Sequence, residues 1–283
     1  MKKQFCILLT LTVTISSFAQ GNLTPTGPPG ATMKTLAQIQ PRTPISSVPF
    51  TITNSGSYYL TTNLVGINGI IISTNSVTLD LNGFWLNGLG GIGKGIDVTY
   101  NSAPRTNIAV FNGNVSGFGG IGVDLSSAVN SRIERVQVSN NGGRGLRIRD
   151  GGLVMACVVS DNGDFGMQIS SDCAVTDCIV RGNQTYGIVG DHNNTIRHCS
   201  VLNNDGSGIW LSGNGSHISD CTVNRNTSTN INTYAIRVAE CSSATDYTVR
   251  YNHGVGIFVD GGSTVRGCTV DYGDSDGIVA IGP

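Results

Sequence analysis

Short apolar segments, each led by a glycine or an alanine, recur along the second half of the chain at an almost constant interval. The leading residues are separated by 21, 21, 21, 27, 21 and 21 positions. Behind each of them, apolar residues alternate with variable ones, which predicts a short β-strand with one buried face. A constant interval of this length indicates a solenoid, in which each coil buries its apolar face against its neighbours. The leading residues are Gly145, Gly166, Gly187, Gly208, Ala235, Gly256 and Gly277.

Two further residue types repeat with the same interval. Cysteine stands at the centre of the pattern Val-x-x-Cys-x-Val, in which isoleucine also occurs at the first position, and asparagine follows the closing valine by three positions. One repeat therefore reads as strand, bend, strand, asparagine turn and strand. The cysteines are Cys157, Cys178, Cys199, Cys221 and Cys268, and the asparagines are Asn141, Asn162, Asn183, Asn204, Asn226 and Asn252.

Upstream glycines extend the repeat with longer intervals. Gly69, Gly95 and Gly122 precede Gly145 at spacings of 26, 27 and 23 residues. Parallel strands joined by crossovers are almost always right-handed. The predicted fold is therefore all-β, a right-handed, single-stranded parallel β-helix (solenoid) of about ten coils with an N-terminal cap.

The pattern divides the chain into four segments. Residues 1–19 read as a secretory signal peptide, because Lys2 and Lys3 precede an apolar run that ends at small residues. Residues 20–31 are rich in Pro, Gly and Thr and read as a flexible linker. Residues 32–63 are expected to cap the first coil with a helical turn and a hairpin or bend, and 64–283 to form the β-helix. No cap is visible near Pro283, which suggests self-association at that end or a lost downstream part.

Composition and charge narrow the class of protein. Only 12% of the residues are charged and 39 are glycine, which suits many tight bends. Without Lys2 and Lys3, 15 basic residues face 18 acidic ones, a net charge of −3. This near-neutral balance argues against a nucleic-acid partner. No later segment is apolar enough to span a membrane, so we expect a secreted or periplasmic protein, with association with the cell surface left open.

The repeated cysteines and asparagines each allow two interpretations. Cysteines could form a metal site or a catalytic thiol, but Val136 and Tyr247 occupy the same register, which favours a ladder of small buried side chains. Disulfides between stacked coils stay open, since neighbouring Cα atoms would lie close enough. The asparagines are expected to stack and hydrogen-bond along the rod rather than to bind a ligand. No metal or other cofactor is therefore predicted.

The repeat resembles the right-handed parallel β-helix proteins of the pectate lyase superfamily, from about Gly56 onward. The opening PRTPISSVPFTI is also similar to the start of secreted bacterial β-helix proteins. The resemblance implies that a polysaccharide is bound along one long face. It does not imply an enzyme, because Asp274-Ser-Asp276 and His253-Gly254 only faintly match the hydrolase motifs and stand in the opposite order. Calcium needs six to eight oxygen ligands, and no acid-dense cluster is present.

The outward register suggests where a polysaccharide would lie. Trp210, Arg237 and Phe258 should stand side by side on three coils, an arrangement that suits sugar rings and a carboxylate or sulfate. Asp205 shares this face as a binding candidate. His253 and Asp274, on neighbouring coils, are weak candidates for acid–base catalysis, with Arg237 beside them.

Less specific interpretations compete with this site. Trp210 and Phe258 could pack beneath the insertion Asn226–Thr233, and Phe165, Tyr186 and Tyr234 read as buried core aromatics. A smaller patch, formed by Asp97, Asp124, Arg147 and Arg149, reads as a solvated face with surface ion pairs. The function predicted is polysaccharide binding, with lyase or hydrolase activity open. The alternative is a non-catalytic structural or adhesive rod.

Overall fold

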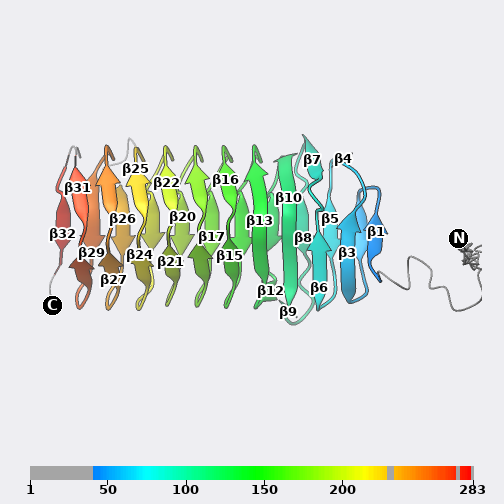
Figure 1. Ribbon diagram of the computed structural model, residues 1–283, viewed down its shortest axis with the longest axis horizontal. Helices are drawn as coiled ribbons and strands as arrows, with labels where there is room; N and C mark the ends of the chain where they lie inside the picture. Colours follow the sequence, from blue (N-terminus) through cyan, green and yellow to red (C-terminus); the bar gives the residue numbers. More distant parts are fainter. Residues whose placement is uncertain (1–40, 228–232, 272–274, 282–283) are drawn as a thin grey trace, which may run out of the picture. The chain divides into compact units, whose positions relative to one another are not determined.

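The structure is a computed structural model that describes residues 41–227, 233–271 and 275–281. The predicted signal peptide, the linker and the first part of the cap segment lie outside the described residues, as do most of the Asn226–Thr233 insertion and Asp274. Residues Arg42–Pro283 form one compact unit. Within it, parallel strands coil around a common axis (Figure 1). None of the described residues belongs to a helix long and apolar enough to cross a membrane.

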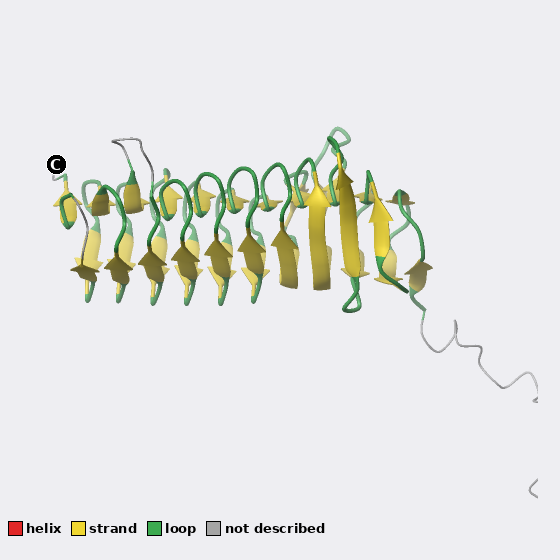
Figure 2. Ribbon diagram, turned by 90° about the horizontal axis from the view of Figure 1, so that it is seen from above, coloured by secondary structure: helices red, strands yellow, loops and turns green. Residues whose placement is uncertain are grey.

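One sheet takes a single strand from each coil and runs the length of this unit (Figures 1 and 2). Its eleven strands show about eleven coils, one more than the sequence predicted. In chain order they are β2 (Phe50–Ile52), β5 (Ile70–Ile72), β8 (Ile96–Val98), β11 (Val123–Leu125), β14 (Leu146–Ile148), β17 (Met167–Ile169), β20 (Ile188–Gly190), β23 (Ile209–Leu211), β26 (Tyr234–Val238), β29 (Val255–Val259) and β32 (Ile278–Ala280).

The remaining walls belong to a second sheet of nineteen strands, in which most coils contribute two strands separated by a bend. In β10 and β13 the strand continues through that bend. A short pair, β9 (Arg105–Thr106) and β12 (Ala128–Val129), stands apart. The nineteen are β1 (Thr43–Ile45), β3 (Gly56–Leu60), β4 (Leu64–Gly66), β6 (Val77–Asp80), β7 (Trp85–Gly90), β10 (Ile108–Phe118), β13 (Arg132–Ser139), β15 (Leu153–Met155), β16 (Val158–Ser160), β18 (Ala174–Thr176), β19 (Ile179–Arg181), β21 (Thr195–Arg197), β22 (Ser200–Leu202), β24 (His217–Ser219), β25 (Thr222–Asn224), β27 (Ser243–Thr245), β28 (Thr248–Arg250), β30 (Thr264–Arg266) and β31 (Thr269–Asp271).

Strand pairing follows the sequence interval. Met167 pairs with Ile188, 21 positions later, and Ile188 pairs with Ile209. The inward side chains of these strands are fully buried. The prediction that residues one interval apart lie directly above one another is therefore confirmed.

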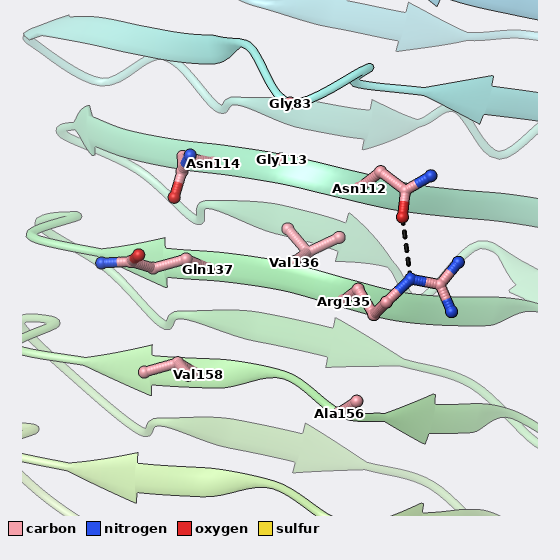
Figure 3. Close-up of a pocket in the computed structure, with 9 residues that line it drawn as sticks. All are labelled: Gly83, Asn112, Gly113, Asn114, Arg135, Val136, Gln137, Ala156 and Val158. Atoms are coloured by element: carbon pink, nitrogen blue, oxygen red, sulfur yellow. Dashed lines mark hydrogen bonds between the residues drawn. The ribbon is translucent and has the colours of Figure 1, made fainter.

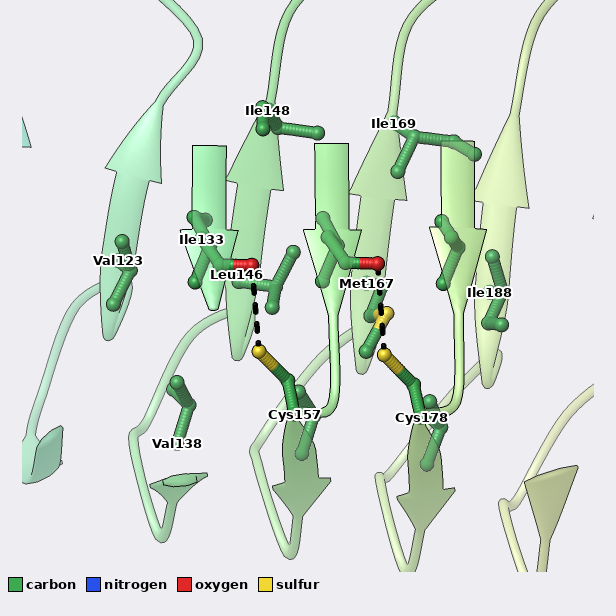
Figure 4. Packing of buried hydrophobic residues seen from close by; sticks show 14 of the residues in the cluster. Val123, Ile133, Val138, Leu146, Ile148, Cys157, Met167, Ile169, Cys178 and Ile188 are labelled. Atoms are coloured by element: carbon green, nitrogen blue, oxygen red, sulfur yellow. Dashed lines mark hydrogen bonds between the residues drawn. The ribbon is translucent and has the colours of Figure 1, made fainter. Parts of the chain in front are cut away.

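Cysteines form a buried ladder inside the coil. Cys157, Cys178, Cys199 and Cys221 are free thiols with at most 2% of their surface exposed. The Cys157 and Cys178 thiols each donate to a carbonyl one coil back, as Figure 4 shows for Ile133. Burial raises the pKa of the Cys173 thiol, which lies outside the ladder, to about 11. This burial favours the interpretation of the cysteines as a ladder of small packed side chains.

Asparagines form a second ladder along one corner of the coil. The Nδ2 of Asn162 donates to Oδ1 of Asn183 at 2.9 Å, and Nδ2 of Asn183 donates to Oδ1 of Asn204 at 2.9 Å. Each Oδ1 also accepts the backbone N–H of the preceding ladder asparagine at 3.1 Å. The buried amides of this ladder thus satisfy one another, and the structural interpretation is confirmed.

The described part of segment 32–63 continues both sheets. Phe50 pairs with Ile70, and Tyr58 pairs with Leu79, both in parallel. The turn around Asn54 is a bend that carries the chain from one sheet to the other, not a hairpin. A cap over this first coil stays a prediction.

Candidate functional site

Five aromatic side chains form a continuous row on the outer face of the eleven-stranded sheet. They come from five consecutive coils and are called here the aromatic ladder. Neighbouring ring centroids are 5.4, 5.4, 5.7 and 5.0 Å apart, and most pairs meet edge to face, the arrangement that aromatic quadrupoles favour. All five side chains are half-buried, so each ring keeps some surface for a ligand. The ladder consists of Phe165, Tyr186, Trp210, Tyr234 and Phe258.

Three members of the ladder correct the sequence prediction. Phe165, Tyr186 and Tyr234 were expected in the core, because strict alternation places the residue before the glycine inward. The alternation breaks at the glycine itself. A Cβ on Gly166 would meet Val180 Cγ1 at 2.5 Å, so this position faces the core and the residue before it turns outward. The ladder therefore draws on two outward positions of the repeat. One is the residue before the leading glycine or alanine, and the other is the second residue after it, the position of Trp210 and Phe258.

Arg237 lies within the ladder. Trp210, Arg237 and Phe258 pair in register on β23, β26 and β29, which confirms their predicted adjacency. The Arg237 Cζ lies 5.0 Å from the Trp210 ring centroid and 5.6 Å from that of Phe258. Its Nη2 is 3.3 Å from Oδ2 of Asp260. Cation–π contacts on two sides hold the guanidinium in place, with donors left for an anion.

Two more arginines stand at the N-terminal end of the ladder. The Arg144 Cζ lies 4.7 Å from the Phe165 ring centroid, and its Nε is 3.1 Å from Oδ2 of Asp164. Arg147 occupies the outward register between Asp124 and Gln168. Among the described residues, Arg147 has no ion-pair or hydrogen-bond partner. Its guanidinium is therefore more available to an anion than that of Arg144, which is paired with Asp164.

A charged cluster continues the same face beyond Arg147. Lys94 Nζ lies 2.7 Å from Asp124 and 2.8 Å from Asp97. Burial alone would raise the pKa of Asp124, but hydrogen bonds from Lys94 and Ser126 outweigh it and leave the pKa lowered. Burial likewise opposes the charge on Lys94, and the two carboxylates leave its pKa raised.

This cluster differs from the solvated patch that the sequence predicted. Asp124 is only 3% exposed, and its partner is Lys94 rather than an arginine. Lys94 directly precedes Gly95, in the register that the alternation rule assigns to the core, and for that reason it was missed. Arg149 instead approaches Asp150, at 3.6 Å.

The remaining candidates are His253, Asp205 and Asp274. His253 and Asp205 are exposed in turns that lead into strands of this face. Asp274 lies outside the described residues, so its predicted proximity to His253 stays a prediction. Among the described side chains, no group of three or more histidines, cysteines and acids could hold a metal ion.

A family model for the right-handed β-helix region matches residues 66–227 and 190–271. The two matches together cover well over half of the chain. The chain belongs to the right-handed β-helix family. No curated protein matches this β-helix protein by sequence.

Solved structures of similar shape are distant in sequence. The A-module of mannuronan C-5 epimerase AlgE4 from Azotobacter vinelandii has a TM-score of 0.56 at 12% identity, covering 83% of this chain and 82% of that one. The A-module of AlgE6 from the same organism has a TM-score of 0.50 at 9% identity, covering 86% and 90%. ORF18 of Geobacillus virus E2 has a TM-score of 0.50 at 12% identity, covering 81% of this chain and 54% of that one. At these identities the likeness shows the fold alone.

Proposed function

We propose that this β-helix protein is exported and binds an acidic polysaccharide along the aromatic ladder. The observation that carries the proposal is the unbroken row of five partly exposed rings with Arg237 between two of them. Aromatic rings accept the apolar faces of sugar rings, and a guanidinium fork binds a carboxylate or sulfate in a bidentate manner. Because the ladder follows the rod, the polysaccharide would lie parallel to the coil axis.

The arginines of this face give the proposal its preference for an acidic polymer. Arg147 and Arg144 stand at one end of the ladder and Arg237 within it, so cations recur along the path of the chain. Two proteins of similar fold are named as mannuronan epimerases, which makes mannuronan the first acidic probe. Asp205 is proposed as a rim contact that accepts a sugar hydroxyl.

Binding without turnover is the activity that the geometry supports best. Glycoside hydrolysis needs two carboxyl groups at a set separation of about 5 to 9.5 Å. On this face Asp124 is paired with Lys94 and Asp260 with Arg237, so each of these carboxylates is held by a cation. A lyase or hydrolase step through His253, Asp274 and Arg237 stays a subordinate hypothesis, tested by assaying the same polysaccharides for new unsaturated or reducing ends.

The direct test is retention on mannuronan and other polysaccharides in affinity electrophoresis. Trp210→Ala combined with Phe258→Ala should weaken the retardation of the acidic polymers by about tenfold or more in affinity, because two of the five rings are removed. Tyr100→Ala, which removes an exposed aromatic side chain away from the ladder, is the matched control and should behave as wild type. Unchanged retardation in the double variant would favour the structural or adhesive rod.

Export and self-association complete the proposal. The signal-like residues 1–19 support a secreted or periplasmic location, which N-terminal sequencing of the exported protein would test.

In the last described coil Ile278 is 49% exposed. Self-association at this end stays a prediction, for which light scattering is the measurement.

A further inference from the structure

An open groove lies on the nineteen-stranded sheet, over the strands β7, β10, β13 and β16, apart from the aromatic ladder. Its larger part has a volume of about 370 Å³ and crosses the bends of these strands (Figure 3). An adjoining part of about 210 Å³ extends toward Trp85. Asn114 and Gln137 line both parts, so the two form one continuous surface.

The groove is built from one outward register. Trp85 pairs with Asn114, and Asn114 pairs with Gln137 on the next strand. Parallel strands lie about 4.8 Å apart, so the indole and the two amides stand in a short row. Two positions further on, Asn87, Ser116 and Ser139 form a second row in the same way.

The row carries groups that are free to bind. The Trp85 side chain is 58% exposed, an unusual position for so large an aromatic residue. Among the residues that the structure describes, neither the side-chain amide of Asn114 nor that of Gln137 is hydrogen-bonded to another protein group. Each amide offers two donors and a carbonyl acceptor, the combination that recognises hydroxyl groups.

The groove differs from the aromatic ladder in its charge. Arg135 is the one charged residue among those that line it, and this side chain is already engaged. Its Nε donates to Asn112 Oδ1 at 2.8 Å, as Figure 3 shows, and its Nη1 is paired with Glu134. Glu134 balances the charge of Arg135, so an anion gains little in this groove over an uncharged, hydroxyl-rich ligand.

The surface is confined to these coils. After Gln137 the same register continues with Val158 and Ile179, which offer no hydrogen-bonding side chain. The amide row therefore ends after two strands, and the indole closes its other end. This length suits one or two rings rather than a long polymer path.

We propose that the groove is a second sugar-binding site, specific for an uncharged sugar unit. One sugar ring stacks on the Trp85 indole, while the Asn114 and Gln137 amides hydrogen-bond to its hydroxyl groups. This site does not depend on the function proposed for the ladder. It would let the protein hold a neutral glycan on one wall and an acidic polysaccharide on another.

The chain contains only two tryptophans, one in each site, and this allows the sites to be observed separately. In Trp210→Phe the emission comes from Trp85 alone, and in Trp85→Phe it comes from Trp210 alone. Each single-tryptophan protein is titrated with cellohexaose, mannohexaose and galactohexaose as neutral probes and with a mannuronan hexasaccharide as the acidic probe. Circular dichroism confirms that the variants are folded.

We expect at least one neutral hexasaccharide to change the Trp85 emission saturably and to leave the Trp210 emission unchanged. Adding Asn114→Ala and Gln137→Ala, both at the surface, should weaken that response by about tenfold or more. The proposal is overturned if no neutral probe changes the Trp85 emission, if the amide variants bind equally well, or if the mannuronan oligomer acts on Trp85 as strongly as the neutral one. The Trp210 signal with mannuronan reports on the ladder independently.

Discussion

Asn183 shows how much a single side chain contributes to this fold. Its Oδ1 accepts two hydrogen bonds from Asn162, and its Nδ2 donates to Asn204 Oδ1 and to the Val159 carbonyl. All of these groups are buried, so removing the amide leaves several donors and acceptors without their protein partner. Each ladder asparagine thus ties its own coil to the coils on both sides.

Replacing Asn183 by alanine should therefore lower the free energy of unfolding by about 3 kcal/mol, because several buried donors and acceptors lose their partner. The neighbouring Gln184 is exposed, and Gln184→Ala serves as the control, with an expected change within about 0.5 kcal/mol. Urea unfolding followed by circular dichroism measures both. Equal stability of the two variants would show that the amide ladder is dispensable.

The Lys94–Asp124 pair predicts a dependence of stability on pH. The pKa of Asp124 is lowered by folding, so its contribution is present above the ordinary aspartate pKa of 3.8 and is lost as the pH falls through the lower folded value. The pKa of Lys94 is raised, so its contribution is present below 10.5 and is lost as the pH rises above that value.

Asp124→Asn should then lower the free energy of unfolding by about 1 to 2 kcal/mol at neutral pH, a value reduced by the partial exposure of Lys94. Below pH 3.8 the variant and the wild type should begin to converge, since the unfolded wild-type chain then binds a proton that the folded Asp124 resists until the pH falls below its lowered pKa. Asp97→Asn is the comparison, with a smaller effect because Asp97 is more exposed. A constant difference from neutral to acid pH would contradict the account.

At the scale of the strand, the glycine that precedes each strand faces the core, and this orientation turns the residue before it outward. The glycine that opens a repeat turns its Cα hydrogens toward Val and Asn side chains of the same and adjacent coils. In Gly166, an added Cβ would lie 2.5 Å from Val180 and 2.6 Å from Asn183. This close approach, rather than a special backbone angle, is the reason for glycine at this position.

A matched pair of substitutions tests this explanation. Gly166→Ala should destabilise the protein by about 2 to 3 kcal/mol, because the methyl group overlaps atoms of the core. Gly277→Ala, in the same register, should change stability little, since among the described residues its added Cβ would meet only Val270, at 3.9 Å. Thermal and urea unfolding provide the comparison. Equal losses in the two variants would mean that glycine is needed here for its backbone freedom.

The sequence predicted the inner side of each strand better than the outer side. Buried positions such as Ile188 and Cys178 repeat with the coil, so their register and burial follow from spacing alone. The break of alternation at the glycine does not appear in the sequence pattern, and Phe165 and Lys94 were therefore misplaced or missed. The groove near Trp85 was not predicted either, because the upstream coils lack the 21-residue interval.

At the scale of the whole molecule, stability is expected to be a sum over neighbouring coils. Deleting residues 166–186 removes one interval of 21 residues and joins Phe165 directly to Gly187. The asparagine, cysteine and strand registers are all preserved across that junction, so the protein should fold into a rod shorter by about 4.8 Å. Deleting only residues 166–175 shifts every register and should prevent folding. Circular dichroism and small-angle X-ray scattering distinguish the results.

The central claim is that the aromatic ladder is the path of an acidic polysaccharide. The ladder extends over four coil intervals, about 19 Å along the rod. If a chain lies along it, the affinity for mannuronan oligomers should rise with length until they cover this distance and then level off.

Isothermal titration calorimetry of mannuronan oligomers of increasing length measures this dependence most directly. The account predicts a plateau at the length of the ladder, and affinity lower by about tenfold or more in Trp210→Ala with Phe258→Ala, each lost ring contact being worth about 1 kcal/mol. It is contradicted if no mannuronan oligomer binds, or if the double variant binds every length as tightly as the wild type.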